Sequence, residues 1–269
     1  MKYAAVCAHV KDEQDIIGEW IAFHIAVGFE HIYIIDNGSS DNTREIIQSF
    51  KDPTRITYLF QPKGVPAEFS TIFIKNYGEN YRWMAFIDAD EFLYPTDGRD
   101  IRSTLSRYEE FSGLGVYWKI YGSNGHDVKP AGLTIDNFTM RARPDHYLHR
   151  HVKSIVDPRK VIQPLGSHIF QLAGDFVDEQ RRHLHDGPPH GYYEDMNPSH
   201  QELRINHYHV RSREQYDRKR KRGYFGVDDS KLQESAERFE HMWRAHDMND
   251  EHDDSAKSYR NLVNFYLER

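Results

Sequence analysis

Two carboxylates, Asp88 and Asp90, directly follow a short apolar run and are the residues of this sequence best suited to chemistry. Residues 83–87 are apolar, and apolar character returns at Phe92. A buried carboxylate is costly unless a cation or hydrogen bonds compensate it. Hard divalent cations take oxygen ligands, and sites of the Mg²⁺ type often combine one or two carboxylates with substrate phosphates. The pattern therefore predicts a cation site at the carboxyl end of a core strand, against the alternative of a solvated turn.

Length and composition limit the classes of protein to which the chain can belong. It has 269 residues, of which 38% are hydrophobic and 29% charged, as in ordinary soluble globular proteins. A net charge of −7 argues against a general nucleic-acid binder. The single cysteine, Cys7, excludes an internal disulfide framework. Met1 leads almost directly into an apolar segment, so we expect no secretory signal and a cytoplasmic location.

The elements that must position the two carboxylates follow from hydrophobic periodicity and turn residues. We predict strands over residues 3–10, 31–35, 56–60, 83–87, 115–121 and 151–156, and helices over 16–27, 43–50, 67–77 and 101–108. Alternating strands and helices over about the first 120 residues indicate an α/β fold with a mostly parallel sheet and helices on both faces.

The remaining segments are less regular. Residues 211–223 form a strongly basic segment with helical character, and residues 230–269 are predicted to form two acidic amphipathic helices. In the second of these helices, we expect four apolar side chains to pack inward: Leu262, Val263, Phe265 and Tyr266. The chain is therefore expected to be one unit with a helical C-terminal appendage.

Three polar clusters fall at the carboxyl ends of predicted strands, at residues 11–13, 36–41 and 88–91. In open parallel sheets, ligands bind at this edge. We therefore expect the three loops to converge on one site, with the third loop carrying the metal ligands.

With these segments placed, the chain resembles the glycosyltransferase family 92 and family 2-like group, which has the GT-A fold. The resemblance covers about residues 3–225 and rests on motifs that occur in the same order: Lys11-Asp12-Glu13, Glu19-Trp20-Ile21 with His24, Gly28-Phe29, Asp36-Asn37 with Ser39 and Asp41, residues 86–93, residues 121–126, residues 151–156, Asn206-His207-Tyr208, and Lys219 with Arg222 and Gly223. Position 12 is Asp where the family more usually has Asn.

The resemblance implies a GT-A domain over residues 1–225 and a C-terminal helical extension over 226–269 packed on the same unit. It implies transfer of a sugar, most simply a hexose, from a UDP-sugar to a carbohydrate or lipid-linked acceptor with inversion. Mn²⁺ or Mg²⁺ would neutralise the leaving diphosphate. A cytoplasmic member would serve the assembly of surface polysaccharide or glycoconjugates.

The resemblance also assigns roles to individual residues. Asp90 is the first choice for direct metal contact, Asp88 binds the ribose or the metal, and His207 is the third metal ligand. Asp36 accepts the uracil N3 proton, and Val10 and Lys11 complete the base pocket. The cations expected to grip the diphosphate are Lys153, Lys219 and Arg222. The general base is either Asp127 or Glu91, a choice that the sequence leaves open.

Each assignment has a structural alternative. Asp36 suits a local turn cap equally well by type, and Glu91 suits an orienting or salt-bridge role. The basic run could be a solvated face or could contact an anionic membrane surface from the cytoplasmic side. The histidine pairs His183 with His185 and His207 with His209 could instead indicate zinc, although no cysteine partner accompanies them.

Two other functional classes compete with the transferase. A nucleotidyltransferase or metal-dependent phosphohydrolase also places an Asp-x-Asp pair on an α/β sheet, but the predicted first loop, residues 6–13, contains no glycine. The other competitor is a nucleotide-sugar-binding protein without catalysis. Release of UDP from a UDP-sugar in the presence of Mn²⁺ separates these classes.

Overall fold

The protein, represented by a computed structural model, is described here over residues 1–50, 52–184, 187–222 and 234–268. A nine-stranded sheet within these ranges has the order β3-β2-β1-β4-β8-β6-β12-β5, with β11 added beside β6. Its strands are β1 (Lys2–Val10), β2 (His31–Asp36), β3 (Ile56–Phe60), β4 (Tyr81–Phe86), β5 (Glu91–Pro95), β6 (Gly113–Ile120), β8 (Val152–Val156), β11 (Phe176–Asp178) and β12 (Leu203–His207).

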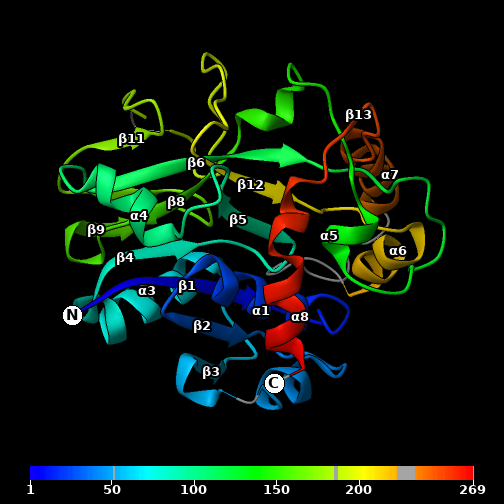
Figure 1. Ribbon diagram of the computed structural model, residues 1–269, viewed down its shortest axis with the longest axis horizontal. Helices are drawn as coiled ribbons and strands as arrows, with labels where there is room; N and C mark the ends of the chain where they lie inside the picture. Colours follow the sequence, from blue (N-terminus) through cyan, green and yellow to red (C-terminus); the bar gives the residue numbers. More distant parts are fainter. Residues whose placement is uncertain (51, 185–186, 223–233, 269) are drawn as a thin grey trace.

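Helices and two small strand pairs surround this sheet (Figure 1). The helices are α1 (Ile17–Val27), α2 (Thr43–Gln48), α3 (Pro66–Tyr77), α4 (Ile101–Leu105), α5 (Thr134–Asn137), α6 (Arg213–Lys221), α7 (Glu234–His246) and α8 (Arg260–Leu267). The small pairs are β9 (Val161–Pro164) with β10 (Phe170–Leu172), and β7 (Met140–Arg141) with β13 (Glu251–His252).

The N-terminal half of the sheet is parallel because each strand is followed by a crossover. β1 pairs in parallel with β2 and β4, and β2 pairs in parallel with β3. β1 is buried on both faces: Ala4, Val6 and Ala8 pack with α1 in the main core, while Ala5 and Cys7 pack with α3. This arrangement explains the continuous apolar run that the sequence shows for β1. The predicted α/β fold with a mostly parallel sheet is confirmed.

The second half of the sheet contains the antiparallel pairs, which periodicity did not predict. β8 lies antiparallel between β4 and β6. β12 is parallel to β6 and antiparallel to β5, with His207 opposite Glu91. These pairings bring residues 203–207 beside the loop that follows β4.

The C-terminal segment contacts the sheet-bearing part at several points. α8 packs on α1, and both lie in front of the sheet in Figure 1. Val263 is fully buried as predicted, but Leu262 and Phe265 are 48% and 40% exposed, so the prediction that they pack inward is wrong. In a helix of eight residues only one narrow face reaches α1. No helix in the described ranges is both long and apolar enough to cross a membrane.

Candidate active site

The loop between β4 and β5 carries Asp88 and Asp90, and the pairing of β5 with β12 places histidines beside it. Tyr208 N donates to the Asp90 carbonyl oxygen (2.8 Å), which extends the pairing beyond His207. Side chains alternate along an extended chain, so His207 and His209 turn to the same side. This strand geometry brings together residues more than 110 positions apart in the sequence.

Asp90, His207 and His209 form a buried cluster with one potential metal ligand atom each, all within 4.8 Å of one another. His207 Nε2 lies 3.8 Å from Asp90 Oδ1, and His209 Nδ1 lies 3.8 Å from Asp90 Oδ2. Burial lowers the pKa of both imidazoles well below the usual range, so both rings are neutral at neutral pH. Burial by itself would raise the pKa of Asp90, but the Lys219 ammonium group holds it well below its usual range.

The cluster has the donor chemistry of a metal site. A divalent cation requires an ionised carboxylate and neutral imidazoles, and these are the protonation states present here. His207 Nδ1 and His209 Nε2 are buried ring nitrogens without a hydrogen-bond partner among the described residues. The residues therefore fit a divalent cation, and two imidazoles favour a transition metal such as Mn²⁺ over oxygen-preferring Mg²⁺.

Asp88 is paired with a different group from Asp90. Its Oδ2 accepts a hydrogen bond from Lys153 Nζ (2.7 Å), and its Oδ1 lies 3.7 Å from His9 Nε2. The Lys153 side chain is 1% exposed, so this is a buried cation facing a carboxylate at the cavity wall. Asp88 is not part of the three-residue cluster, and its role as a metal ligand or ribose ligand stays a prediction.

Glu91 lies behind the loop in the protein interior and does not line the cavity. It is fully buried, and its Oε2 accepts a hydrogen bond from Asp88 N (2.8 Å). Burial raises the pKa of Glu91 well above its usual range, and the neighbouring carboxylates add to this effect. These contacts fit the alternative role in which Glu91 orients its neighbours. From this buried position its carboxyl group does not face the cavity in which an acceptor would bind.

Asp127, the other candidate base, is also outside the cavity. It is exposed, and its carbonyl oxygen accepts a hydrogen bond from Glu214 N (2.9 Å) at the first turn of α6. The cavity described below does not include Asp127 in its wall. The geometry thus opposes both predicted general bases.

Helix α6 brings two of the predicted cations to the site. Lys219 Nζ donates to Asp90 Oδ2 and lies 3.2 Å from His209 Nδ1. Arg222, which follows the last residue of α6, donates to the carbonyl oxygens of Lys11 and Asp12 and pairs with Glu13 Oε1 at 2.6 Å. The two cations therefore connect the metal-type cluster to the loop that follows β1.

The residues predicted to hold the base lie at the ends of β1 and β2. Val10 is buried, and its carbonyl oxygen accepts a hydrogen bond from Asn37 N (2.8 Å). Asp36 is 1% exposed; its Oδ1 accepts from Ser39 N and its Oδ2 from Tyr58 Oη, each at 2.7 Å. This is the turn-cap arrangement, although each carboxylate oxygen keeps a further lone pair. Recognition of uracil by Asp36 stays a prediction.

A cavity of about 580 Å³ opens over the cluster. Its lining includes charged groups and the cluster histidines, namely Glu13, Asp88, Asp90, His207, His209, Lys219, Arg222 and Arg238. It also includes aromatic and apolar side chains, namely Pro66, Trp118, Leu148, His151, His168, His190, Met242 and His246. Met242 and His246 come from α7, so the C-terminal segment contributes to the cavity.

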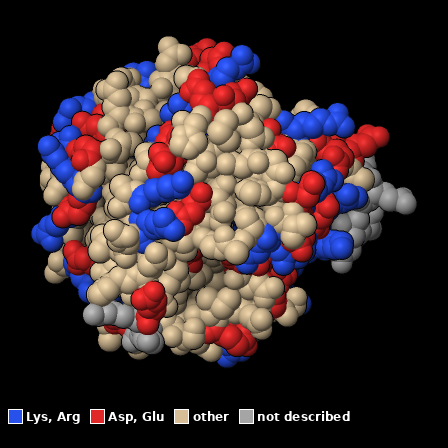
Figure 2. All heavy atoms as spheres, turned by 45° about the vertical axis from the view of Figure 1, so that its right-hand side comes forward, with Lys and Arg blue, Asp and Glu red and all other residues tan. Residues whose placement is uncertain are grey.

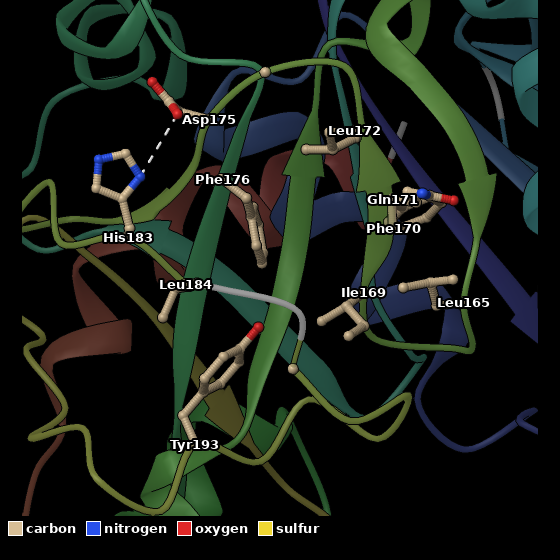
Figure 3. A pocket seen from close by; sticks show the side chains of 12 residues that line it. Leu165, Ile169, Phe170, Gln171, Leu172, Asp175, Phe176, His183, Leu184 and Tyr193 are labelled. Carbon is tan, nitrogen blue, oxygen red and sulfur yellow. Dashed lines mark ion pairs between the residues drawn. The ribbon is translucent and has the colours of Figure 1, made fainter.

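A second hollow, of about 240 Å³, lies between the β9–β10 pair and β11, and both apolar and polar side chains line it (Figure 3). At its rim, His183 Nδ1 lies 3.6 Å from Asp175 Oδ1. His185, the predicted zinc partner of His183, lies outside the described residues. Apart from His183 of the alternative zinc pair, none of the residues predicted from the sequence to bind donor or metal lines this hollow.

The basic run 211–222 is paired with acids over much of its length. Arg211 pairs with Glu13, Arg213 with Glu240, and Arg218 with Asp15. Figure 2, which brings the α6 and α7 side forward, shows basic and acidic side chains interspersed on this face. The run therefore stabilises the junction of α6 with the first loop, in addition to supplying Lys219 and Arg222.

Sequence reasoning missed His209 as a partner of His207 in the transferase site, and it missed His151, His168 and His246 in the cavity wall. The alternation in His207-Tyr208-His209 was a usable signal, because two residues separated by one share a side of an extended chain. His246 carried no such signal, since α7 reaches the cavity only through tertiary packing.

Comparison with known proteins agrees with this fold. The family model described as glycosyl transferase family 2 matches residues 10–162, more than half of the chain. Similar curated proteins are named glycosyltransferase family 92 proteins: one from Oryza sativa subsp. japonica, 29% identical over 161 residues, and one from Ricinus communis, 27% identical over 211 residues. These alignments cover 57% and 76% of this chain but only 26% and 34% of those proteins.

Among solved structures, S. aureus TarS aligns with a TM-score of 0.40 and 16% identity, over 59% of this chain and 47% of that one. The α/β sheet has the expected strand arrangement, and the family model matches more than half of the chain. Together, these two observations define the protein class as glycosyltransferases with a GT-A fold. The chain belongs to glycosyl transferase family 2. The predicted resemblance is confirmed, and the nucleotidyltransferase and phosphohydrolase alternatives lose their support.

Proposed function

We propose that the protein is a metal-dependent glycosyltransferase that moves a hexose from a UDP-sugar to a carbohydrate or lipid-linked acceptor with inversion. The observation that carries the proposal is the Asp90, His207 and His209 cluster in the wall of the large cavity, beside the cations of α6. Membership of glycosyl transferase family 2 supports the reaction class. The UDP-sugar donor is what the resemblance of the sequence motifs implies.

The residues divide the work of donor binding. Asp90, His207 and His209 would hold Mn²⁺, with Mg²⁺ as the weaker candidate. When bound, the cation supplies Lewis-acid stabilisation of the charge that accumulates on the departing diphosphate. Lys219 and Arg222 add positive charge beside the same leaving group, as ammonium and guanidinium groups do in other phosphate sites.

Lys153 and Glu91 act on the loop from the protein side. Lys153 fixes the Asp88 carboxylate by a 2.7 Å hydrogen bond, and Glu91 fixes the Asp88 backbone N–H. The loop is therefore held from two directions before any donor binds, which reduces the ordering cost of binding. We propose residues 1–225 as the catalytic unit and 226–269 as an extension that completes the cavity wall.

The test is calorimetric titration of the purified protein with UDP, first with Mn²⁺ and then with EDTA. We expect micromolar binding that requires the metal, and we expect Asp90→Asn to abolish it. Asp145→Asn, which changes an exposed carboxylate that does not line the cavity, is the matched control and should bind as wild type.

Two results would contradict the proposal in different ways. UDP binding that is identical in Mn²⁺ and EDTA would refute the metal dependence. Absence of UDP binding in both would refute the donor, and titration with ADP, GDP and CMP would then identify another nucleotide. Binding without release of UDP from any UDP-sugar would show a nucleotide-sugar-binding protein without catalysis.

A further inference from the structure

The carboxylates in the wall of the large cavity are already paired with cations. Glu13 Oε1 lies 2.6 Å from Arg222, Asp88 Oδ2 lies 2.7 Å from Lys153, and Asp90 faces Lys219. A carboxylate held in its ionised form by an adjacent cation is a weak proton acceptor. Glu91 is buried and Asp127 lies outside the cavity. Among the residues that the structure describes, this leaves the histidines of the cavity lining as the candidates for the base of the acceptor hydroxyl.

Two histidines of the cavity lining have their tautomers fixed by backbone carbonyl oxygens. His151 Nδ1 lies 3.1 Å from the Leu148 carbonyl oxygen, and His168 Nδ1 lies 2.9 Å from that of Val152. A carbonyl oxygen can only accept, so Nδ1 of each ring carries the proton. Nε2 of each ring therefore has a free lone pair, and both residues line the cavity.

The two rings differ in their surroundings. The ring of His151 is stacked on Trp118, with centroids 4.6 Å apart and planes at 19°, and packs on Tyr192 at 4.9 Å. Trp118 also contacts His207 of the cluster, with ring centroids 4.1 Å apart. His168 is only 8% exposed and meets Trp118 edge-on. His151 is thus the more accessible of the two. The Trp118 ring contacts both His151 and His207, and so connects His151 to the cluster.

From this geometry we infer that His151 is the general base of the transfer reaction. The acceptor hydroxyl oxygen forms a bond to the anomeric carbon of the donor, and its proton passes to His151 Nε2. The bond from the anomeric carbon to the diphosphate oxygen breaks, and its electron pair leaves with UDP. The imidazolium then releases its proton to water. The inference rests on the proposed function and adds its missing catalytic residue.

The charged and titratable groups around His151 keep its ring neutral. Burial lowers the pKa of His151 to about 4, and His190 and Lys153 add to this effect. His168 and the Tyr192 ring are its other titratable neighbours. The ring is therefore neutral at neutral pH, with its Nε2 lone pair unprotonated, and it is a weaker base than a free imidazole. The negative charge of a bound diphosphate would raise the pKa of His151 toward the working pH.

The experiment compares His151→Gln with His168→Gln and with His252→Gln, which changes an exposed histidine of β13. The probes are UDP-glucose and UDP-N-acetylglucosamine with Mn²⁺. The assay measures the rate at which UDP is released when water acts as the acceptor, and calorimetry measures the affinity for UDP. We expect His151→Gln to lower the release rate by about 10²- to 10⁴-fold. UDP affinity should change by less than about threefold, and both other variants should release UDP within about tenfold of wild type.

A second variant and a pH profile keep the inference testable if the glutamine variant folds poorly. His151→Ala should regain at least about tenfold of its lost rate when free imidazole is added, because the base is replaced and not merely a contact. The acidic limb of the wild-type pH profile should be absent from both His151 variants. Wild-type release rates in His151→Gln, or a greater loss in His168→Gln, would overturn the inference. A wild-type protein that binds UDP with Mn²⁺ but releases none would overturn the proposed catalysis, and this inference with it.

Discussion

Removal of the Asp253 carboxylate is expected to destabilise the strand that carries His207. Asp253 accepts hydrogen bonds from Arg204 Nη1 (3.0 Å) and Nη2 (2.9 Å), and from Arg141 Nε (3.1 Å). Arg204 lies on β12, three residues before His207, and its side chain is 8% exposed. Asp253 thus connects the C-terminal segment to the centre of the second half of the sheet.

The expected magnitude follows from the burial of the guanidinium group. Breaking a buried ion pair by removing one partner leaves an uncompensated charge and costs about 3–5 kcal/mol. Arg204 would retain its hydrogen bond to Tyr94 Oη (2.7 Å), which is neutral and does not replace the carboxylate. We therefore expect Asp253→Ala to lower the free energy of unfolding by about 3–5 kcal/mol, and Asp253→Asn to lower it by less because the amide keeps part of the hydrogen bonding.

Urea denaturation followed by circular dichroism and tryptophan fluorescence measures this effect. The midpoint should fall with an unchanged slope, and Asp254→Ala, which removes an exposed neighbouring carboxylate, is the matched control. The cycle of Asp253→Ala with Arg204→Met should show strong coupling, since an unpaired buried arginine is the source of the loss. A loss of less than about 1 kcal/mol in Asp253→Ala would refute the reasoning that Arg204 depends on this partner.

Further predictions concern the cavity and the packing around it. Lys219→Met should bind Mn²⁺ at least about tenfold more tightly, because the ammonium group of Lys219 competes with the metal for Asp90. The same variant should bind UDP more weakly. An unchanged Mn²⁺ affinity in calorimetry would contradict this prediction. Burial raises the pKa of Glu19 to about 7, although N–H groups of Thr134 and Ile135 oppose the rise. The pKa of Glu19 is higher in the folded than in the unfolded protein. Its contribution to the free energy of unfolding is therefore complete below pH about 4.3 and is lost as the pH rises through about 7. Denaturation curves of Glu19→Gln should show a weaker dependence of stability on pH in this range. Gly122→Ala should lower the free energy of unfolding by about 1–3 kcal/mol, because its methyl group would lie 2.4 Å from the Met248 carbonyl oxygen. Gly18→Ala within α1 has ordinary van der Waals clearance, so thermal melts should show unchanged or increased stability.

Local pattern was sufficient for the parts of the fold that local interactions determine. The apolar run of β1 and the spacing of α1 up to Gly28, whose φ of 107° suits glycine, predicted elements that the structure contains. The position of Asp90 after β4 followed from the same reasoning. In each case burial and backbone preference within a few residues decide the outcome.

The pairing of β5 with β12 was beyond local reasoning because its partners are far apart in sequence. Glu91 and His207 are opposite each other, and nothing within either segment indicates the other. For the same reason local pattern joined neither histidine to Asp90. The resemblance supplied His207, and only then could the alternation along the chain have added His209. Leu262 and Phe265 were misplaced because a hydrophobic pattern does not show how wide a face the partner helix covers.

The separation between the two halves of the metal-type cluster also has a kinetic consequence. The parallel strands β1, β2, β3 and β4 are joined by short crossovers, but β12 must close a loop of over 100 residues to reach β5. Contacts of such separation carry a greater loop-closure entropy and form late in folding. A folding intermediate with the parallel strands in place would thus contain Asp90 without His207 and His209. Acquisition of Mn²⁺ affinity during refolding would then mark the closing of the sheet, after most of the secondary structure has formed.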